Sequence, residues 1–193
     1  EGHSLIERVV AQLRKAFPEV LVVGDPETYR GLGDRVVADI FPEAGPLGGI
    51  HAGLTFATYD PVFVAACDLP FIEGSLASLI VERLEGFDAA VPCVGGRLQP
   101  LFAAYRKTCL GPVTRSLEAG RRRVVGFLGE VRVCYLTEAD FEGWPHFRRV
   151  FFNVNTPADL RRLQHKIAAG VPVVGVAGPS KTGKTRLIEG IVA

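Results

Sequence analysis

Residues 61–71 read PVFVAACDLPF, and this stretch decides how the chain is expected to fold. The unbroken apolar run over residues 62–66 predicts a strand that is buried on both faces of a sheet. The strand ends at Cys67 and Asp68. A carboxylate there is costly unless it faces a cleft, pairs with a cation or binds a metal. Asp68 is therefore a candidate site residue.

Similar apolar runs alternate with helical periodicity on both sides of this stretch. The predicted strands cover residues 20–23, 35–38, 62–66, 89–93, 98–105 and 131–135, and the predicted helices cover residues 4–17, 50–57, 75–84, 107–119 and 156–169. This order predicts an α/β fold with three layers: a Rossmann-like, mostly parallel sheet covered by helices on both faces. Ligands bind at the carboxyl ends of such strands, where Asp39 and Asp68 are expected.

Composition excludes several classes of protein. The 193 residues contain 22 Lys and Arg against 21 Asp and Glu, a balance that is unusual for a nucleic-acid binder. No apolar run approaches the roughly 20 residues of a membrane span. The 4 Cys form no Cys-x-x-Cys pair, which predicts reduced thiols and a cytoplasmic protein. The chain has no Met and begins with Glu1, so we interpret it as a window on a longer protein.

Three further motifs carry polar or glycine residues beside predicted elements. Gly48 and Gly49, in a loop before a helix, let a backbone approach an anion, although an ordinary tight turn explains them equally well. Gln99 lies beside a strand, and Asn153 and Asn155 precede a helix, where Asn also serves as a cap. The three Arg at 121–123 suit an anionic substrate, or form a solvated surface.

The last residues differ from the rest. Residues 178–185 read GPSKTGKT, a phosphate-binding loop between strand-like and helix-like segments. We therefore predict one domain over residues 1–170 and the start of a P-loop domain over residues 171–193. Only one helix follows the loop, so Gly183, Lys184 and Thr185 are expected to bind nothing well.

Five motifs in order resemble the molybdenum cofactor guanylyltransferases of the MobA type. They are GPLGGI at 45–50, CDLPF at 67–71, QPLFAAY at 99–105, RRV at 122–124 and NVNTPADL at 153–160. The resemblance implies a nucleotidyltransferase that uses GTP and Mg²⁺, joins GMP to molybdopterin and releases pyrophosphate. The attacking phosphate is already an anion, so no general base is needed, and catalysis rests on positioning and charge neutralisation.

The resemblance also assigns residues and partners. Asp68 is similar to the catalytic aspartate that binds Mg²⁺ and GTP, and Asp39 to a second aspartate that contacts GTP. The cofactor-binding set is completed by Gly48, Gly49, Gln99, Asn153 and Asn155. The final loop resembles the start of a MobB-type GTP-binding adaptor, which implies a fusion of the two. A molybdoenzyme or chaperone is the implied acceptor of the product.

The chain departs from the family pattern in two places. Family members begin with a strand and a glycine-rich loop followed by a Lys, and no such segment is present in residues 1–193. A protein without that loop is expected to be inactive. Gly24 stands where the family often has Asn, so a contact to the base or ribose is expected to be lost.

Other functions stay open at this stage. A cytidylyltransferase or another nucleotidyltransferase could use the same scaffold, and comparing activity on GTP and CTP separates these. A non-catalytic adaptor would bind GTP through the P-loop, but about twenty residues are too few for a domain. A degenerate transferase kept for assembly is the third alternative.

Overall fold

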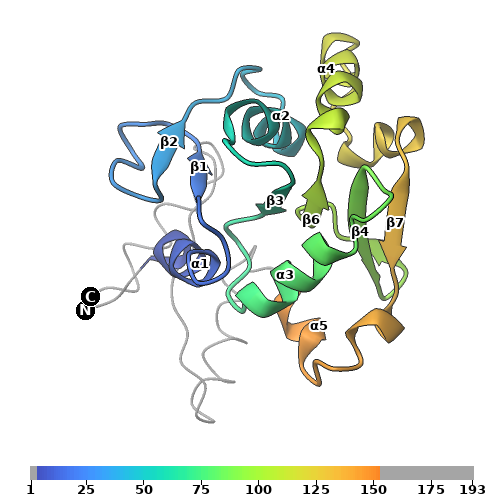
Figure 1. Ribbon diagram of the computed structural model, residues 1–193. Coiled ribbons are helices and arrows are strands. Elements are labelled where there is room, and N and C mark those ends of the chain that lie inside the picture. The colour runs from blue at the N-terminus through green and yellow to red at the C-terminus, as the bar shows by residue number, and fades with distance from the viewer. Residues whose placement is uncertain (1–3, 153–193) are drawn as a thin grey trace.

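The computed structural model describes residues 4–152. Helices and strands alternate along this segment (Figure 1). The α-helices are α1 (Leu5–Leu13), α2 (Pro46–Phe56), α3 (Gly74–Glu82), α4 (Leu110–Glu118) and α5 (Phe147–Val150). The strands are β1 (Leu21–Val23), β2 (Arg35–Val37), β3 (Val62–Ala65), β4 (Ala89–Val94), β5 (Arg97–Leu98), β6 (Phe102–Tyr105) and β7 (Val133–Leu136).

The strands form two sheets. The larger sheet has the order β3-β6-β4-β5, with β7 also paired to β4. Since β6 is antiparallel to both β3 and β4, and β7 is parallel to β4, the strands β3, β4 and β7 all run in one direction. The smaller sheet is the parallel pair of β1 and β2. The expected α/β fold with a mostly parallel sheet is confirmed, with β6 and β5 as the reversed strands.

The three-layer arrangement follows from the alternation of side chains along the central strands. Ala89 and Val91 of β4 belong to a core cluster with residues of α2 and α4, whereas Ala90 between them belongs to a cluster with residues of α1 and α3. Successive side chains of a strand point to opposite faces. Each face of the sheet is therefore covered by its own pair of helices, as Figure 1 shows.

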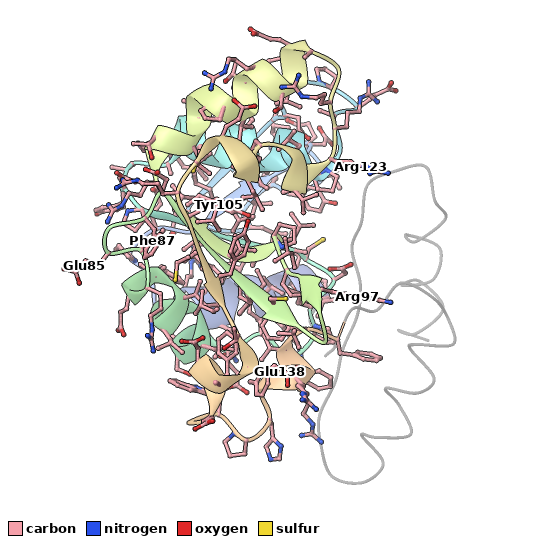
Figure 2. All side chains as sticks on the ribbon, turned by 90° about the vertical axis from the view of Figure 1, so that its right-hand side faces the viewer. Glu85, Phe87, Arg97, Tyr105, Arg123 and Glu138 are labelled. Atoms are coloured by element: carbon pink, nitrogen blue, oxygen red, sulfur yellow. The ribbon has the colours of Figure 1, made fainter. Side chains whose placement is uncertain are left out.

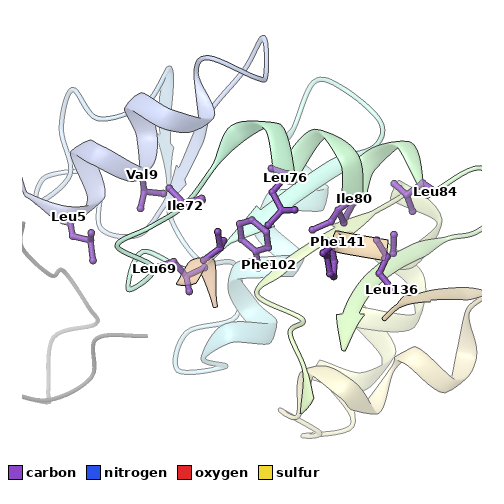
Figure 3. Packing of buried hydrophobic residues seen from close by; sticks show 14 residues of the cluster. Leu5, Val9, Leu69, Ile72, Leu76, Ile80, Leu84, Phe102, Leu136 and Phe141 are labelled. Atoms are coloured by element: carbon purple, nitrogen blue, oxygen red, sulfur yellow. The ribbon is translucent and has the colours of Figure 1, made fainter. Parts of the chain in front are cut away.

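Aromatic side chains tie the α1/α3 face together. Phe102 of β6 is 1% exposed, and its ring meets the rings of Phe63 and Phe151 edge-on. Figure 3 shows Phe102 at the centre of the packing, among residues of α1, α3, β7 and the segment that follows β3. This core fixes the chain on either side of Asp68.

Three predicted elements differ from the structure by more than a small shift of their ends. The glycine segment before residue 50 is not a loop: α2 begins at Pro46, because Pro suits the first helical position and Gly45 turns the chain with φ of 64°. The predicted strand at 98–105 is two strands separated by a turn at Pro100, which has no N–H to donate to a sheet. The predicted helix over 4–17 ends at Leu13.

The helices of residues 4–152 are all too short or too polar to cross a lipid bilayer.

Candidate functional site

Asp68 and Gln99 follow strands that meet at one edge of the larger sheet. Ala65 of β3 pairs with Phe102 of β6, and the Ala66 N–H donates to the carbonyl of Leu101 over 2.8 Å. The end of β3 therefore lies beside the turn that begins β6. The backbone N–H of Gln99 donates to the Pro92 carbonyl of β4 over 2.8 Å, which brings the end of β4 to the same edge.

The position of Asp68 is set by the residues that follow it. Leu69 and Ile72 are 3% and 5% exposed and belong to the core cluster on the α1/α3 face (Figure 3). Asp68 is thus held between the end of β3 and an anchored turn. Its carboxylate oxygen Oδ1 is buried. A buried carboxylate oxygen just past the carboxyl end of β3 is well placed to bind a cation, because water competes little for it.

Asp39 lies against the first turn of α2. A Cβ atom added to Gly48 would lie 3.1 Å from Asp39 Oδ1 and 3.0 Å from the Ala44 Cβ, so only glycine allows this close approach. By contrast, a Cβ atom added to Gly49 would meet no protein atom within 4 Å. The structure therefore assigns different surroundings to the two predicted glycines: Gly48 packs against Asp39, and Gly49 borders open space.

The amino end of α2 offers backbone donors. Gly45, which precedes the helix, provides no side chain to accept from the first N–H groups, and Pro46 has no N–H. The Gly49 N–H already bonds to the Gly45 carbonyl. The N–H groups of Leu47 and Gly48 are too near the helix start for an intrahelical acceptor. Such groups, with the helix dipole behind them, suit an anion such as a phosphate.

His51 is a buried neighbour of Asp39 to which the sequence assigns no role. Its side chain is 6% exposed, and its Nε2 lies 3.1 Å from the Thr114 hydroxyl of α4. Because that hydroxyl donates to the Leu110 carbonyl, Nε2 must be the donor, which leaves Nδ1 as an unprotonated acceptor. Within residues 4–152, Nδ1 has no hydrogen-bond partner.

Burial and the charge of the neighbouring side chain have opposite effects on the pKa values of Asp39 and His51. Burial raises the pKa of Asp39, and the nearby His51 opposes that rise. Burial likewise lowers the pKa of His51, against the effect of Asp39. His51 is therefore neutral at physiological pH. Sequence reasoning missed it because a lone His on a helix has no signal of its own; only the packing of α2 on α4 shows that it is buried near Asp39.

The smaller sheet adjoins the Asp68 turn through Cys67. Cys67 packs against the cluster that holds Val22 of β1 and Val36 of β2. The carboxyl ends of β1 and β2 therefore belong to the same region as the end of β3. At the end of β1, the ring of Tyr29 lies over Gly24, where an added Cβ would come within 2.7 Å of it. An Asn at this position would require Tyr29 to move.

The arginines of the predicted cationic segment separate in the structure. Arg121 pairs with Glu130 over 3.6 Å and bonds to Ser116, so it stabilises the end of α4. Arg122 and Arg123 are exposed, as is Arg97 of β5. No ion pair of these three is recorded within residues 4–152. Figure 2 shows Arg97 and Arg123 projecting from the same side of the molecule, with Glu85 on the opposite side.

Two sets of predicted residues lie outside the described segment. Asn153 and Asn155 fall beyond residue 152, as does the phosphate-binding loop at 178–185. Within residues 4–152, no group of three or more His, Cys, Asp or Glu side chains could enclose a metal ion. A metal at Asp68 would thus take most of its ligands from outside these side chains.

Comparison with known proteins shows the family to which the chain belongs. A family model described as "MobA-like NTP transferase domain" matches residues 1–132. A protein of Pelotomaculum thermopropionicum named "Probable molybdenum cofactor guanylyltransferase" is 44% identical over 158 residues, which are 81% of this chain and 77% of that protein. The crystal structure of molybdopterin-guanine dinucleotide biosynthesis protein A from Archaeoglobus fulgidus has a TM-score of 0.70 at 25% identity, covering 86% of each chain.

A more distant structure shares the fold. The 2-C-methyl-D-erythritol 4-phosphate cytidylyltransferase of Thermus thermophilus has a TM-score of 0.62 at 22% identity, over 87% of this chain and 90% of that one. At this identity the likeness shows the fold alone. The matched family domain covers more than half of the chain and includes both aspartates. The chain belongs to the MobA-like nucleotidyltransferase family.

Proposed function

We propose that this protein transfers GMP from GTP to molybdopterin. An oxygen of the molybdopterin phosphate attacks the α-phosphorus of GTP, a new P–O bond forms, and the bond to the β-phosphate breaks. The products are the guanine dinucleotide cofactor and pyrophosphate. The single observation that carries the proposal is Asp68, with its buried carboxylate oxygen just past the end of β3, in a chain whose relatives are named for this reaction.

The nucleotide is proposed to lie between the first turn of α2 and the end of β3. The N–H groups of Leu47 and Gly48 would donate to phosphate oxygens, and the open space at Gly49 admits the phosphate chain. Asp39, at the edge of this turn, would contact the nucleoside. Gln99 would contribute from the β6 turn, and Asn153 and Asn155 complete the proposed set.

Asp68 fits a magnesium ion. Mg²⁺ is commonly bound by one or two carboxylates together with substrate phosphates, so a single buried carboxylate oxygen is a suitable protein contribution. The ion would neutralise charge on the triphosphate as pyrophosphate leaves. Asp68 would hold the ion at the end of β3, and the buried Leu69 next to it keeps this oxygen in place.

The exposed arginines are proposed to bind the other substrate. Arg97 and Arg123 project from one side, and guanidinium groups suit phosphate because they donate two parallel hydrogen bonds (Figure 2). The molybdopterin phosphate must come within reach of the α-phosphate of GTP. Both substrates are anions, so these cations would also offset their mutual repulsion.

The decisive experiment replaces Asp68 by Asn in the intact protein. We expect the rate of GMP transfer to fall at least about 100-fold, the size seen when a key electrostatic group is removed. Stability should change little, since Asn keeps the shape of the side chain. Glu85→Gln removes an equally negative, exposed side chain on the side of the molecule opposite Arg97 and Arg123, and it serves as the control (Figure 2).

Activity of Asp68→Asn within twofold of the unmodified protein would refute this role. Assaying GTP and CTP in parallel tests the choice of base: a preference for CTP would favour the cytidylyltransferase alternative.

The division of the chain at residue 170 and the start of a MobB-type domain after it are likewise proposed. GTP binding that survives Asp68→Asn and is lost in Lys184→Ala would show that the P-loop segment binds nucleotide by itself.

A further inference from the structure

The hairpin of β4 and β5 is short and ends in a tight turn. Only two residue pairs join the strands, Cys93 with Leu98 and Val94 with Arg97. The turn residues Gly95 and Gly96 have φ of 58° and 72°, the conformation of a two-residue type I′ turn. A two-stranded hairpin is marginally stable by itself, so contacts to the rest of the protein must hold this one.

Glu138 supplies such a contact from the segment that follows β7. Its Oε1 accepts a hydrogen bond from the Gly95 N–H over 3.0 Å. Its other oxygen, Oε2, forms an ion pair with the guanidinium of Arg148 in α5. The hydrogen bond from Arg148 holds the pKa of Glu138 below its usual range, with a further contribution from the Gly95 N–H. We call the Gly95, Glu138 and Arg148 contacts the hairpin clasp.

The clasp holds the turn that precedes Arg97. The Gln99 side chain donates to the Arg97 carbonyl over 3.4 Å, and the Gln99 backbone bonds to Pro92 of β4. The backbone that follows Arg97 is thereby tied to the sheet, and the clasp holds the backbone that precedes Arg97. In Figure 2, Arg97 projects from the hairpin and Glu138 lies below it.

We propose that the hairpin clasp positions Arg97 to receive the phosphate of molybdopterin; this rests on the proposed function. Glu138 and Arg148 are positioning residues, since they act through the hairpin and do not touch substrate. Guanidinium recognition of phosphate depends on orientation, so a hairpin that moves loses binding even when Arg97 is present.

The test compares variants that remove the clasp in different ways. In Glu138→Ala the Gly95 N–H loses its acceptor, and we expect KM for molybdopterin to rise about five- to tenfold, the effect of about one lost hydrogen bond. KM for GTP should change less than KM for molybdopterin, because Gln99 is the one proposed GTP residue of the described segment beside the hairpin, and its backbone stays bonded to Pro92. Glu138→Gln keeps an oxygen acceptor for Gly95 and should recover most of the loss. Arg149→Ala, which removes the neighbouring exposed arginine, is the control and should have no effect.

A double-variant cycle separates positioning from a general structural effect. If the clasp acts through Arg97, Glu138→Ala should add no further rise in KM to a protein that already carries Arg97→Ala. A full additional rise in the double variant would overturn the proposal. An unchanged KM in Glu138→Ala, with a raised KM in Arg97→Ala, would also overturn it while leaving the proposed function intact. If Arg97→Ala has no effect either, both the clasp and the assignment of Arg97 are wrong.

Discussion

Replacing Gly48 and Gly49 by Ala, one at a time, tests how Asp39 and the nucleotide lie against α2. The two glycines are neighbours in the first turn of the same helix, and neither has a positive φ. The gain in helix propensity from Gly to Ala, up to about 1 kcal/mol in a helix interior, is therefore nearly the same at both positions. It cancels when the two variants are compared, which leaves the steric cost.

The structure sets the size of that cost. At Gly48, the new Cβ would lie 3.0 Å from Ala44 Cβ, 3.1 Å from Asp39 Oδ1 and 3.3 Å from the Phe41 carbonyl oxygen. Optimal carbon contacts are about 3.5–4.0 Å, so atoms on three sides must shift. Overpacking of this kind costs about 1–3 kcal/mol. At Gly49 nothing lies within 4 Å, so no steric cost arises.

Urea or thermal unfolding of the two variants measures the difference. We expect Gly48→Ala to be less stable than Gly49→Ala by about 1–3 kcal/mol. For a chain of this length, each kcal/mol corresponds to about 2–4 °C in Tm. Equal stabilities, within about 0.5 kcal/mol, would refute the close packing of Asp39 on Gly48.

The same variants test where GTP binds. Because Gly49→Ala should fold at least as well as the unmodified protein, any loss of GTP binding reports on the ligand. If phosphates occupy the open space at Gly49, the new methyl group should raise KM for GTP about tenfold, which corresponds to about 1.4 kcal/mol. An unchanged KM would exclude a phosphate from this turn.

Two further predictions concern stability. Asp88 accepts hydrogen bonds from Arg132, which hold the pKa of Asp88 at about 2, below the ordinary 3.8. The stabilisation that ionised Asp88 contributes is present above pH 3.8 and is lost as the pH falls toward 2, so Asp88→Asn should lower the free energy of unfolding at pH 7 by about 1–2 kcal/mol and make it less dependent on pH between these values. An unchanged acid-unfolding transition in Asp88→Asn would contradict this. Leu69→Ala empties a site that is 3% exposed and should cost about 3 kcal/mol in urea unfolding; a cost below about 1 kcal/mol would mean that Leu69 does not anchor the Asp68 turn.

The sequence predicted the elements that depend on near neighbours. The helix predicted from residue 4 begins there, with a capping box in which the Ser4 N–H donates to the Glu7 carboxylate. The apolar run before Asp68 forms β3, and the aspartate follows the carboxyl end of that strand as expected. However, β3 is the outer strand of the larger sheet and is only partly buried, so the expected burial on both faces is wrong. Periodicity reports these features because it arises from contacts within one turn of a helix or one strand. The start of α2 was misplaced because a glycine cluster is as typical of a turn as of a helix that needs close packing.

Only the tertiary structure decided how these elements combine. No local pattern indicates that β6 is inserted antiparallel between β3 and β4, which brings the turn before β6 beside the end of β3. The contact of His51 with Thr114 spans 63 residues, and that of Gly95 with Glu138 spans 43. Such contacts form because the sheet and its two helix layers must bury their apolar faces together. The sequence by itself thus predicted candidate residues at the ends of strands, and packing between distant segments decided which segments meet.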